Sequence, residues 1–178
     1  MPRSFSLTWF LVAVALAGCG LPRDPEGTLD RVRGDTLRVG VTEAPPFVVR
    51  RGAAGIPGGV EAALVQAFAD SLGAVVAWHW GPAEAHFEAL KRYELDLVAA
   101  GLTAATPWKA HVGLTRPYHT AHEARGRARG REPGRRLRTV EHTLAVPPGE
   151  NGFLHALEGF LEPRRRAVEA ALVREAVP

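Results

Sequence analysis

Leu37-Arg38-Val39-Gly40-Val41 is the stretch that decides the fold. It alternates apolar and polar residues and runs into a loop at Pro45-Pro46-Phe47, which predicts a strand followed by a turn. Residues 75–80 are β-branched and aromatic, and residues 95–99 read Leu-Asp-Leu-Val-Ala, so each predicts a further strand. These three predicted strands divide the first half of the folded chain into the segments that lie between them.

Helical patterns lie between the predicted strands. From Val60 to Leu72 the apolar residues recur at helical spacing, and Gly73 follows where a C-terminal cap belongs. Residues 82–93 predict a second helix from the placement of Phe87 and Leu90. Strands that alternate with helices of this length indicate βαβ units, so we expect an α/β fold with a single doubly wound, mainly parallel sheet.

Towards the end of the chain the pattern returns. Residues 143–146 predict a strand, residues 147–149 a turn, and residues 153–161 a helix, and Pro163 opens a further helical stretch. We therefore expect one domain rather than two.

The net charge of +3 conceals a local basic run. Residues 125–138 hold seven arginines against the single acid Glu132, so the remaining residues are acidic in sum. Glycines and a proline interrupt the run, which predicts a loop in contact with solvent or with anionic lipid headgroups. Nucleic acid is not expected as a partner, because the N-terminus indicates an exported protein.

That N-terminus carries an uncharged apolar stretch, residues 7–17, which runs into the segment Leu16-Ala17-Gly18-Cys19. The layout is typical of a secretory signal, and the stretch is shorter than the roughly 20 residues of a membrane span. An ordinary signal or an uncleaved helix remains an alternative. Residues 19–36, which are rich in proline, glycine and charge, predict a flexible tether.

The four residues ending at Cys19 resemble the lipobox of bacterial lipoproteins. The resemblance implies that residues 1–18 are a signal peptide and that Cys19, the only cysteine of the chain, carries acyl chains such as palmitate. The implied location is the periplasm or the cell exterior, with the protein anchored to the membrane by lipid.

Seven further segments, in order, resemble bacterial extracellular solute-binding proteins of family 3, the receptors that deliver amino acids and similar solutes to ABC importers. The segments are Leu37-Arg38-Val39-Gly40-Val41, Pro45-Pro46-Phe47, Gly59-Val60-Glu61-Ala62-Ala63-Leu64, Ser71-Leu72-Gly73, Ala89-Leu90 with Leu95-Asp96-Leu97-Val98, Gly101-Leu102-Thr103 and Pro117-Tyr118. The implied partners are a small polar solute and an ABC permease.

Members of that family have two lobes that close on the solute. Here the second lobe has room only between Tyr118 and His142, and fewer than 30 residues lie there. One βαβ unit alone takes roughly 30 residues. We therefore expect one lobe of the type II periplasmic binding protein fold over residues 37–118. An Arg-rich loop at 119–141 would replace the second lobe, and a returning strand and helices would occupy residues 142–178.

The resemblance implies a ligand site at the strand ends. In the family, an arginine after the third strand binds the solute carboxylate in two parallel hydrogen bonds. Here the segment reads Thr106-Pro107-Trp108-Lys109, so either Trp108 or Lys109 takes that place and the two-pronged contact is missing. The residues expected to contact the solute are Phe47, Trp80, Thr103, Thr106 and Lys109, although core packing remains open for Phe47 and Trp80 and a solvated loop lysine for Lys109.

Other chemistries are weaker. His111, His119, His122 and Glu123 match no strong metal signature, so we expect neither a metal nor a cofactor. The chain has no Gly-x-Ser-x-Gly, no phosphate loop and no cysteine nucleophile, and no enzyme is expected. Two alternatives stay open: an envelope scaffold or sensor accessory that uses the lobe or the basic loop, and a periplasmic dehydratase-like enzyme. Glu61 and Asp96 are interpreted as structural.

Overall fold

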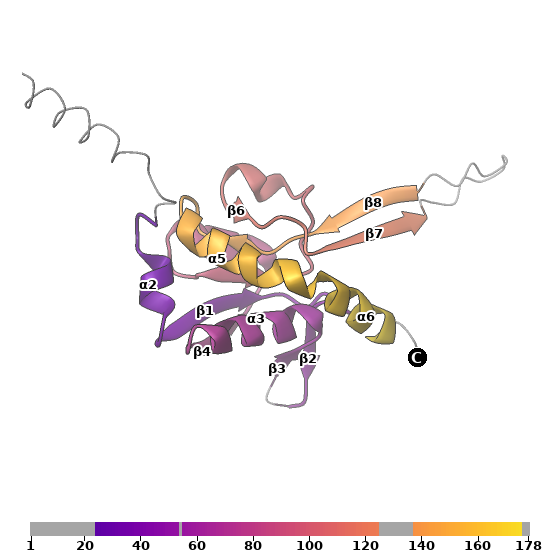
Figure 1. Ribbon diagram of the computed structural model, residues 1–178, viewed down its shortest axis with the longest axis horizontal. Helices are drawn as coiled ribbons and strands as arrows, with labels where there is room; N and C mark the ends of the chain where they lie inside the picture. Colours follow the sequence, from indigo (N-terminus) through magenta and orange to yellow (C-terminus); the bar gives the residue numbers. More distant parts are fainter. Residues whose placement is uncertain (1–23, 54, 125–136, 176–178) are drawn as a thin grey trace, which may run out of the picture.

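The computed structural model describes residues 24–53, 55–124 and 137–175, and it has a five-stranded sheet at its centre (Figure 1). The strand order is β4-β1-β5-β9-β6. Strand β1 pairs in parallel with both β4 and β5, whereas β9 pairs antiparallel with β5 and β6. The expected mainly parallel α/β sheet is confirmed.

The sheet strands are β1 (Thr36–Val41), β4 (Val75–Trp80), β5 (Leu97–Ala99), β6 (Gly113–Leu114) and β9 (Ala145–Val146). Two hairpins lie outside it, one of β2 (Val49–Arg51) and β3 (Ile56–Gly58), the other of β7 (His119–Ala124) and β8 (Leu137–His142). The helices are α2 (Thr28–Val32), α3 (Val60–Ser71), α4 (Ala83–Lys91), α5 (Asn151–Leu161) and α6 (Arg165–Glu175), with short 3-10 turns at Pro107–Ala110 and Glu162–Arg164.

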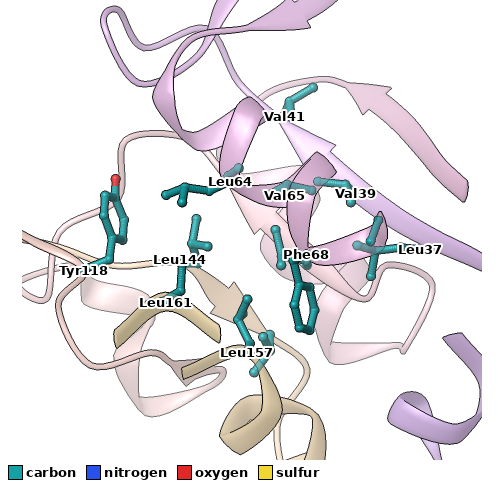
Figure 2. Close-up of a cluster of buried hydrophobic side chains, with 14 of the residues drawn as sticks. Leu37, Val39, Val41, Leu64, Val65, Phe68, Tyr118, Leu144, Leu157 and Leu161 are labelled. Carbon is teal, nitrogen blue, oxygen red and sulfur yellow. The ribbon is translucent and has the colours of Figure 1, made fainter. Parts of the chain in front are cut away.

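Helices cover both faces of the sheet, as a doubly wound fold requires. On one face α3 packs between the sheet and α5, and Figure 2 shows Phe68 of α3 between the side chains of β1 and those of α5. On the other face α4 buries Phe87 and Leu90 against Val98 of β5. The two helices follow β1 and β4 respectively, so the predicted βαβ units produce these two layers.

The amino end of the sheet is held by a buried acid. Asp96, which is 1% exposed, precedes β5 and accepts hydrogen bonds from the backbone N–H of Arg38 at 2.8 Å and from its guanidinium at 2.6 and 3.1 Å. Arg31 of α2 donates to the same carboxylate. Asp96 therefore connects α2, β1 and β5.

The structure corrects the expected tether of residues 19–36 over its described part, residues 24–36. Residues 24–36 pack onto the fold, because two acids join this segment to the start of α5. Asp24 accepts from the N–H of Phe153 in α5 at 3.0 Å, and Glu150 accepts from the N–H of Thr28 in α2 at 2.9 Å. These bonds satisfy N–H groups that a helix leaves unpaired at its start. The prolines and charges of this segment suggested flexibility, but its acid serves as a cap.

The place of a second lobe is taken by a hairpin. Strands β7 and β8 pair from His119↔His142 to Ala124↔Leu137 and project from the body of the molecule (Figure 1). Their outer ends are joined through residues 125–136, so the expected Arg-rich loop begins and ends in paired strands. Residues 125–136, like the expected signal peptide and Cys19, lie outside the described residues. No helix in the described ranges is both long and apolar enough to cross a membrane.

Candidate functional site

The candidate site lies where β1 and β5 end and the β7–β8 hairpin leaves the sheet. The Phe47 ring, in the loop after β1, stacks on the His142 imidazole with ring centroids 4.1 Å apart. Thr103, in the loop after β5, forms a backbone bridge with His142. The His119 ring also stacks on His142, with centroids 5.8 Å apart. Three segments that are distant in sequence thus meet at the carboxyl edge of the sheet, where open α/β folds bind ligands.

A buried glutamate supports this edge and the hinge, by which we mean residues 117–119 and His142 at the base of the β7–β8 hairpin. Glu61, in the first turn of α3, is fully buried and accepts hydrogen bonds from the Tyr118 hydroxyl at 2.5 Å and the Gly101 N–H at 3.0 Å. Burial raises the pKa of Glu61 from 4.5 to about 7, and the hydrogen bonds oppose the rise. The pKa of Tyr118 is also raised well above its usual value, first by burial and then by the nearby carboxylate. Glu61 therefore ties α3 to the β5 loop and to the hinge.

Gly101 places Phe47 against this support. It has a φ of 61°, in the left-handed region that favours glycine. A Cβ at Gly101 would lie 3.0 Å from the Cβ of Ala44 and 3.3 Å from Cδ2 of Phe47. The bare backbone of Gly101 allows the two loops to approach.

Two of the expected ligand residues lie on the loop after β5. The Thr106 side chain accepts from the N–H of Trp108 at 3.4 Å and so caps the 3-10 turn. Lys109 is exposed, and its ammonium makes no hydrogen bond or ion pair with the part of the chain that the structure describes. Lys109 is thus the available cation of this loop.

Trp108, the other candidate for the arginine's place, turns away into the fold. Its ring stacks on Phe87 of α4 with centroids 5.0 Å apart and an interplanar angle of 15°, and it packs against the cluster on that face of the sheet. This packing holds Trp108 against α4, away from Phe47 and Thr103.

Trp80 is held by the β2–β3 hairpin. Its indole N–H donates to the carbonyl of Gly55 at 2.6 Å, and the Arg50 guanidinium lies 3.9 Å from the ring centroid. No contact places Trp80 beside Phe47 and Thr103 in the described residues, so of the five expected ligand residues the structure brings Phe47 and Thr103 together through His142.

The largest described cavity does not coincide with the candidate site. The largest one described, about 330 Å³, lies between β3, α3 and Trp78. We place the candidate site at the strand ends instead, because the loops and the polar groups converge there. Among the described residues no three His, Cys, Asp or Glu side chains are grouped so that they would hold a metal ion.

Sequence reasoning missed the role of His142. Phe47 and His142 are far apart in the sequence, and no spacing in the sequence predicts that their rings stack. Glu61 was interpreted as structural, and it lies in the first turn of α3, where an acid is favoured by the helix dipole. Its complete burial, and its bond to Tyr118, depend on the hinge folding back over α3.

Fold and strand ends together define a solute-binding lobe. The family model of bacterial extracellular solute-binding proteins, family 3, matches residues 37–167. The chain belongs to this family, whose name places its members outside the cytoplasm. None of the curated protein sequences is similar enough to match this chain.

Solved structures of the same fold agree. A mutant of domain 1 from TmArgBP in its arginine-bound form has a TM-score of 0.60 at 20% identity, and the match covers 78% of this chain and 98% of that one. An ancestral cationic amino acid solute-binding protein has a TM-score of 0.66 at 17% identity, covering 83% and 98%. The L-cystine solute receptor of Neisseria gonorrhoeae, unliganded and open, has a TM-score of 0.60 at 13% identity, covering 79% and 91%. At these identities the likeness concerns the fold.

Proposed function

We propose that this chain is a lipid-anchored, single-lobe receptor that binds a small polar solute such as an amino acid and serves an ABC importer. The observation that carries the proposal is the meeting of Phe47, Thr103 and the hinge at the carboxyl edge of the sheet. The family assignment supports it. The arginine-bound form of an isolated domain 1 in another protein also supports the idea that one lobe of this fold suffices to hold a solute.

The solute's carboxylate would meet Lys109 rather than an arginine. A lysine ammonium is a point charge and lacks the planar fork of a guanidinium. With the opposite face open to water, the solute keeps part of its hydration, and we expect weak, millimolar-range affinity. Phe47 and Thr103 would add an apolar surface and a hydroxyl.

The anchor would hold the lobe close to the membrane. Only residues 20–23 separate Cys19 from Asp24, the first residue of the packed segment. At about 3.5 Å per extended residue they span less than roughly 20 Å. We therefore infer that the end of the molecule carrying α2 faces the lipid surface.

A dehydratase is the weaker candidate, although one structural neighbour is described as a precursor of cyclohexadienyl dehydratase. A pKa near 7 suits a general acid. The Glu61 carboxyl, however, is fully buried and bonded to Tyr118 and Gly101, so it has no access to a substrate. We propose a binding role without catalysis.

The proposal is tested by titrating amino acids and small polyamines into the protein and following thermal stability and amide NMR shifts. We expect saturable shifts around Phe47 and Thr103 for at least one amino acid. Lys109→Gln should weaken binding about fivefold or more, and Lys91→Gln, a lysine that pairs with Glu88 on α4, should leave it unchanged. The absence of any shift at millimolar concentrations would overturn the transport role.

A further inference from the structure

A second cavity lies behind the hinge, between the start of β7 and the start of α6. Its volume is about 180 Å³. Residues 117–120 line one side, and Arg165, Arg166 and Glu169 of α6 line the other. Of these residues, Tyr118 and His119 also take part in the ring contacts at the strand ends, each with His142.

The three charged side chains are in different states. Arg165 is fixed, because its guanidinium donates to the carbonyl of Pro117 and pairs with Glu162 at 3.4 Å. Arg166 and Glu169 make no hydrogen bond or ion pair with any residue that the structure describes. Opposite charges three residues apart on a helix commonly pair with each other. Here a cation and an anion open separately into one small cavity.

This arrangement selects ligands by charge. A lone anion would be attracted by the two arginines and repelled by Glu169, and a lone cation would meet the reverse. A molecule with both charges satisfies both, since guanidinium groups donate to an oxyanion and Glu169 attracts an ammonium. At about 180 Å³ the cavity is small, and it is open to solvent on the side of its exposed charged residues, so it suits a small solute.

We propose that this cavity binds a small zwitterion whose oxyanion contacts Arg165 and Arg166 and whose ammonium contacts Glu169. A free α-amino acid with a short side chain has this chemistry, as does a phosphoethanolamine headgroup, and we assign the site to the free solute. The hydroxyl of Thr120 on the opposite wall offers a further hydrogen bond to the oxyanion.

The cavity is also linked to the strand ends. His119 lies on its wall, and the His119 ring faces His142, which in turn stacks on Phe47. A ligand in the cavity therefore lies one ring stack away from the candidate solute site, and its arrival is expected to move the NMR signals of all three rings.

The test titrates the whole protein with L-alanine, acetate and ethylammonium and follows amide and imidazole NMR signals. We expect alanine to shift Thr120, His119 and Glu169 in a saturable way, and acetate and ethylammonium to bind at least tenfold more weakly. Arg166→Gln and Glu169→Gln should each weaken alanine binding about fivefold or more.

A control variant establishes whether the alanine shifts arise in this cavity. Arg174→Gln, on the same helix but outside the cavity, should leave the alanine shifts of Thr120, His119 and Glu169 unchanged. Circular dichroism checks that the variants stay folded, which is expected because the altered side chains are exposed.

Three results would overturn the proposal. Acetate that binds as well as alanine, with Glu169→Gln without effect, would make this a simple anion site. Alanine shifts that are the same in Arg166→Gln and in Glu169→Gln as in the unmodified protein would place alanine binding elsewhere. Flotation with phosphatidylethanolamine vesicles that depends on Arg166, without any shift from free alanine, would assign the site to a lipid headgroup.

Discussion

The two ends of the central sheet hold a buried carboxylate in different ways. At the amino end, Asp96 is 1% exposed and is paired with the guanidinium groups of Arg31 and Arg38. At the carboxyl end, Glu61 is fully buried and accepts hydrogen bonds from neutral donors, the Tyr118 hydroxyl and the Gly101 N–H. The first end is fixed by charge, whereas the second holds a carboxyl whose pKa is about 7. The candidate site lies at the second end.

In a binding lobe, one end of the sheet must stay rigid and the other must respond to ligands, and the two carboxylates differ in this way. Ion pairs with several hydrogen bonds keep strands in register but resist rearrangement. A carboxyl that is half protonated near neutral pH changes its charge with little cost, and its partners belong to the β5 loop and to the hinge. The carboxyl end is therefore the end at which pH and ligands are expected to act.

The largest expected effect comes from breaking the amino end. Asp96→Ala leaves the Arg38 backbone N–H and two guanidinium groups without their acceptor, and we expect a loss of about 3 kcal/mol in the free energy of unfolding. Chemical denaturation measures this. Glu94→Ala, which removes an exposed pair with Arg92, is the control and should change little. Equal losses in the two variants would contradict the special role of Asp96.

The next effect tests the pKa at the carboxyl end. Because the folded-state pKa of Glu61 is raised from 4.5 to about 7, the folded protein binds more protons than the unfolded chain between these values. Stability from this group is therefore present at low pH and is lost as the pH rises through 7, by about 2 kcal/mol between pH 5 and 8. Denaturation at several pH values measures it.

Glu61→Gln provides the comparison for that profile. The amide keeps an oxygen for the Gly101 N–H but has no proton to lose, so the fall in stability between pH 5 and 8 should flatten. A profile identical to that of the unmodified protein would show that another group titrates, and it would remove the contrast between the two ends.

Sequence patterns predicted the amino-terminal half of the sheet well. The strands at 36–41 and 75–80 and the helix at 60–71 were found because each carries its own periodicity or composition. The β2–β3 hairpin has no counterpart among the predicted elements, since β3 has only three residues and contains Pro57. The two-residue strand β6 was missed because so short a strand has no period.

The candidate site was less predictable. The expected residues Phe47 and Thr103 came together, but the partner that joins them, His142, lies in the returning strand. Trp108 and Lys109 were equal candidates by counting, and the stack of Trp108 on Phe87 distinguishes them. Such contacts depend on how helix α4 is placed over the sheet, which local patterns do not encode.

A smaller effect is expected at Gly101, the residue that links Glu61 to the Phe47 loop. In Gly101→Ala the new Cβ sits at a positive φ and close to Ala44 and Phe47, so we expect a loss of about 1 to 2 kcal/mol. Gly159→Ala on α5 is the matched control, because nothing lies within 4 Å of its Cβ and alanine favours a helix. Thermal denaturation of both variants would contradict the account if Gly159→Ala were the more destabilising.

The smallest expected effect concerns His119, the ring between the hinge cavity and His142. Burial lowers the pKa of His119 below 6.5, and the carboxylate of Glu169 partly restores it. Removing that carboxylate in Glu169→Gln should lower the pKa of His119 further, because the imidazolium loses its nearby negative charge while its burial stays the same. A pH titration of the His119 ring signals by NMR measures the change, with Glu84→Gln on α4 as a control at an exposed site. A pKa of His119 that stays the same or rises in Glu169→Gln would contradict the influence of the Glu169 carboxylate on this ring.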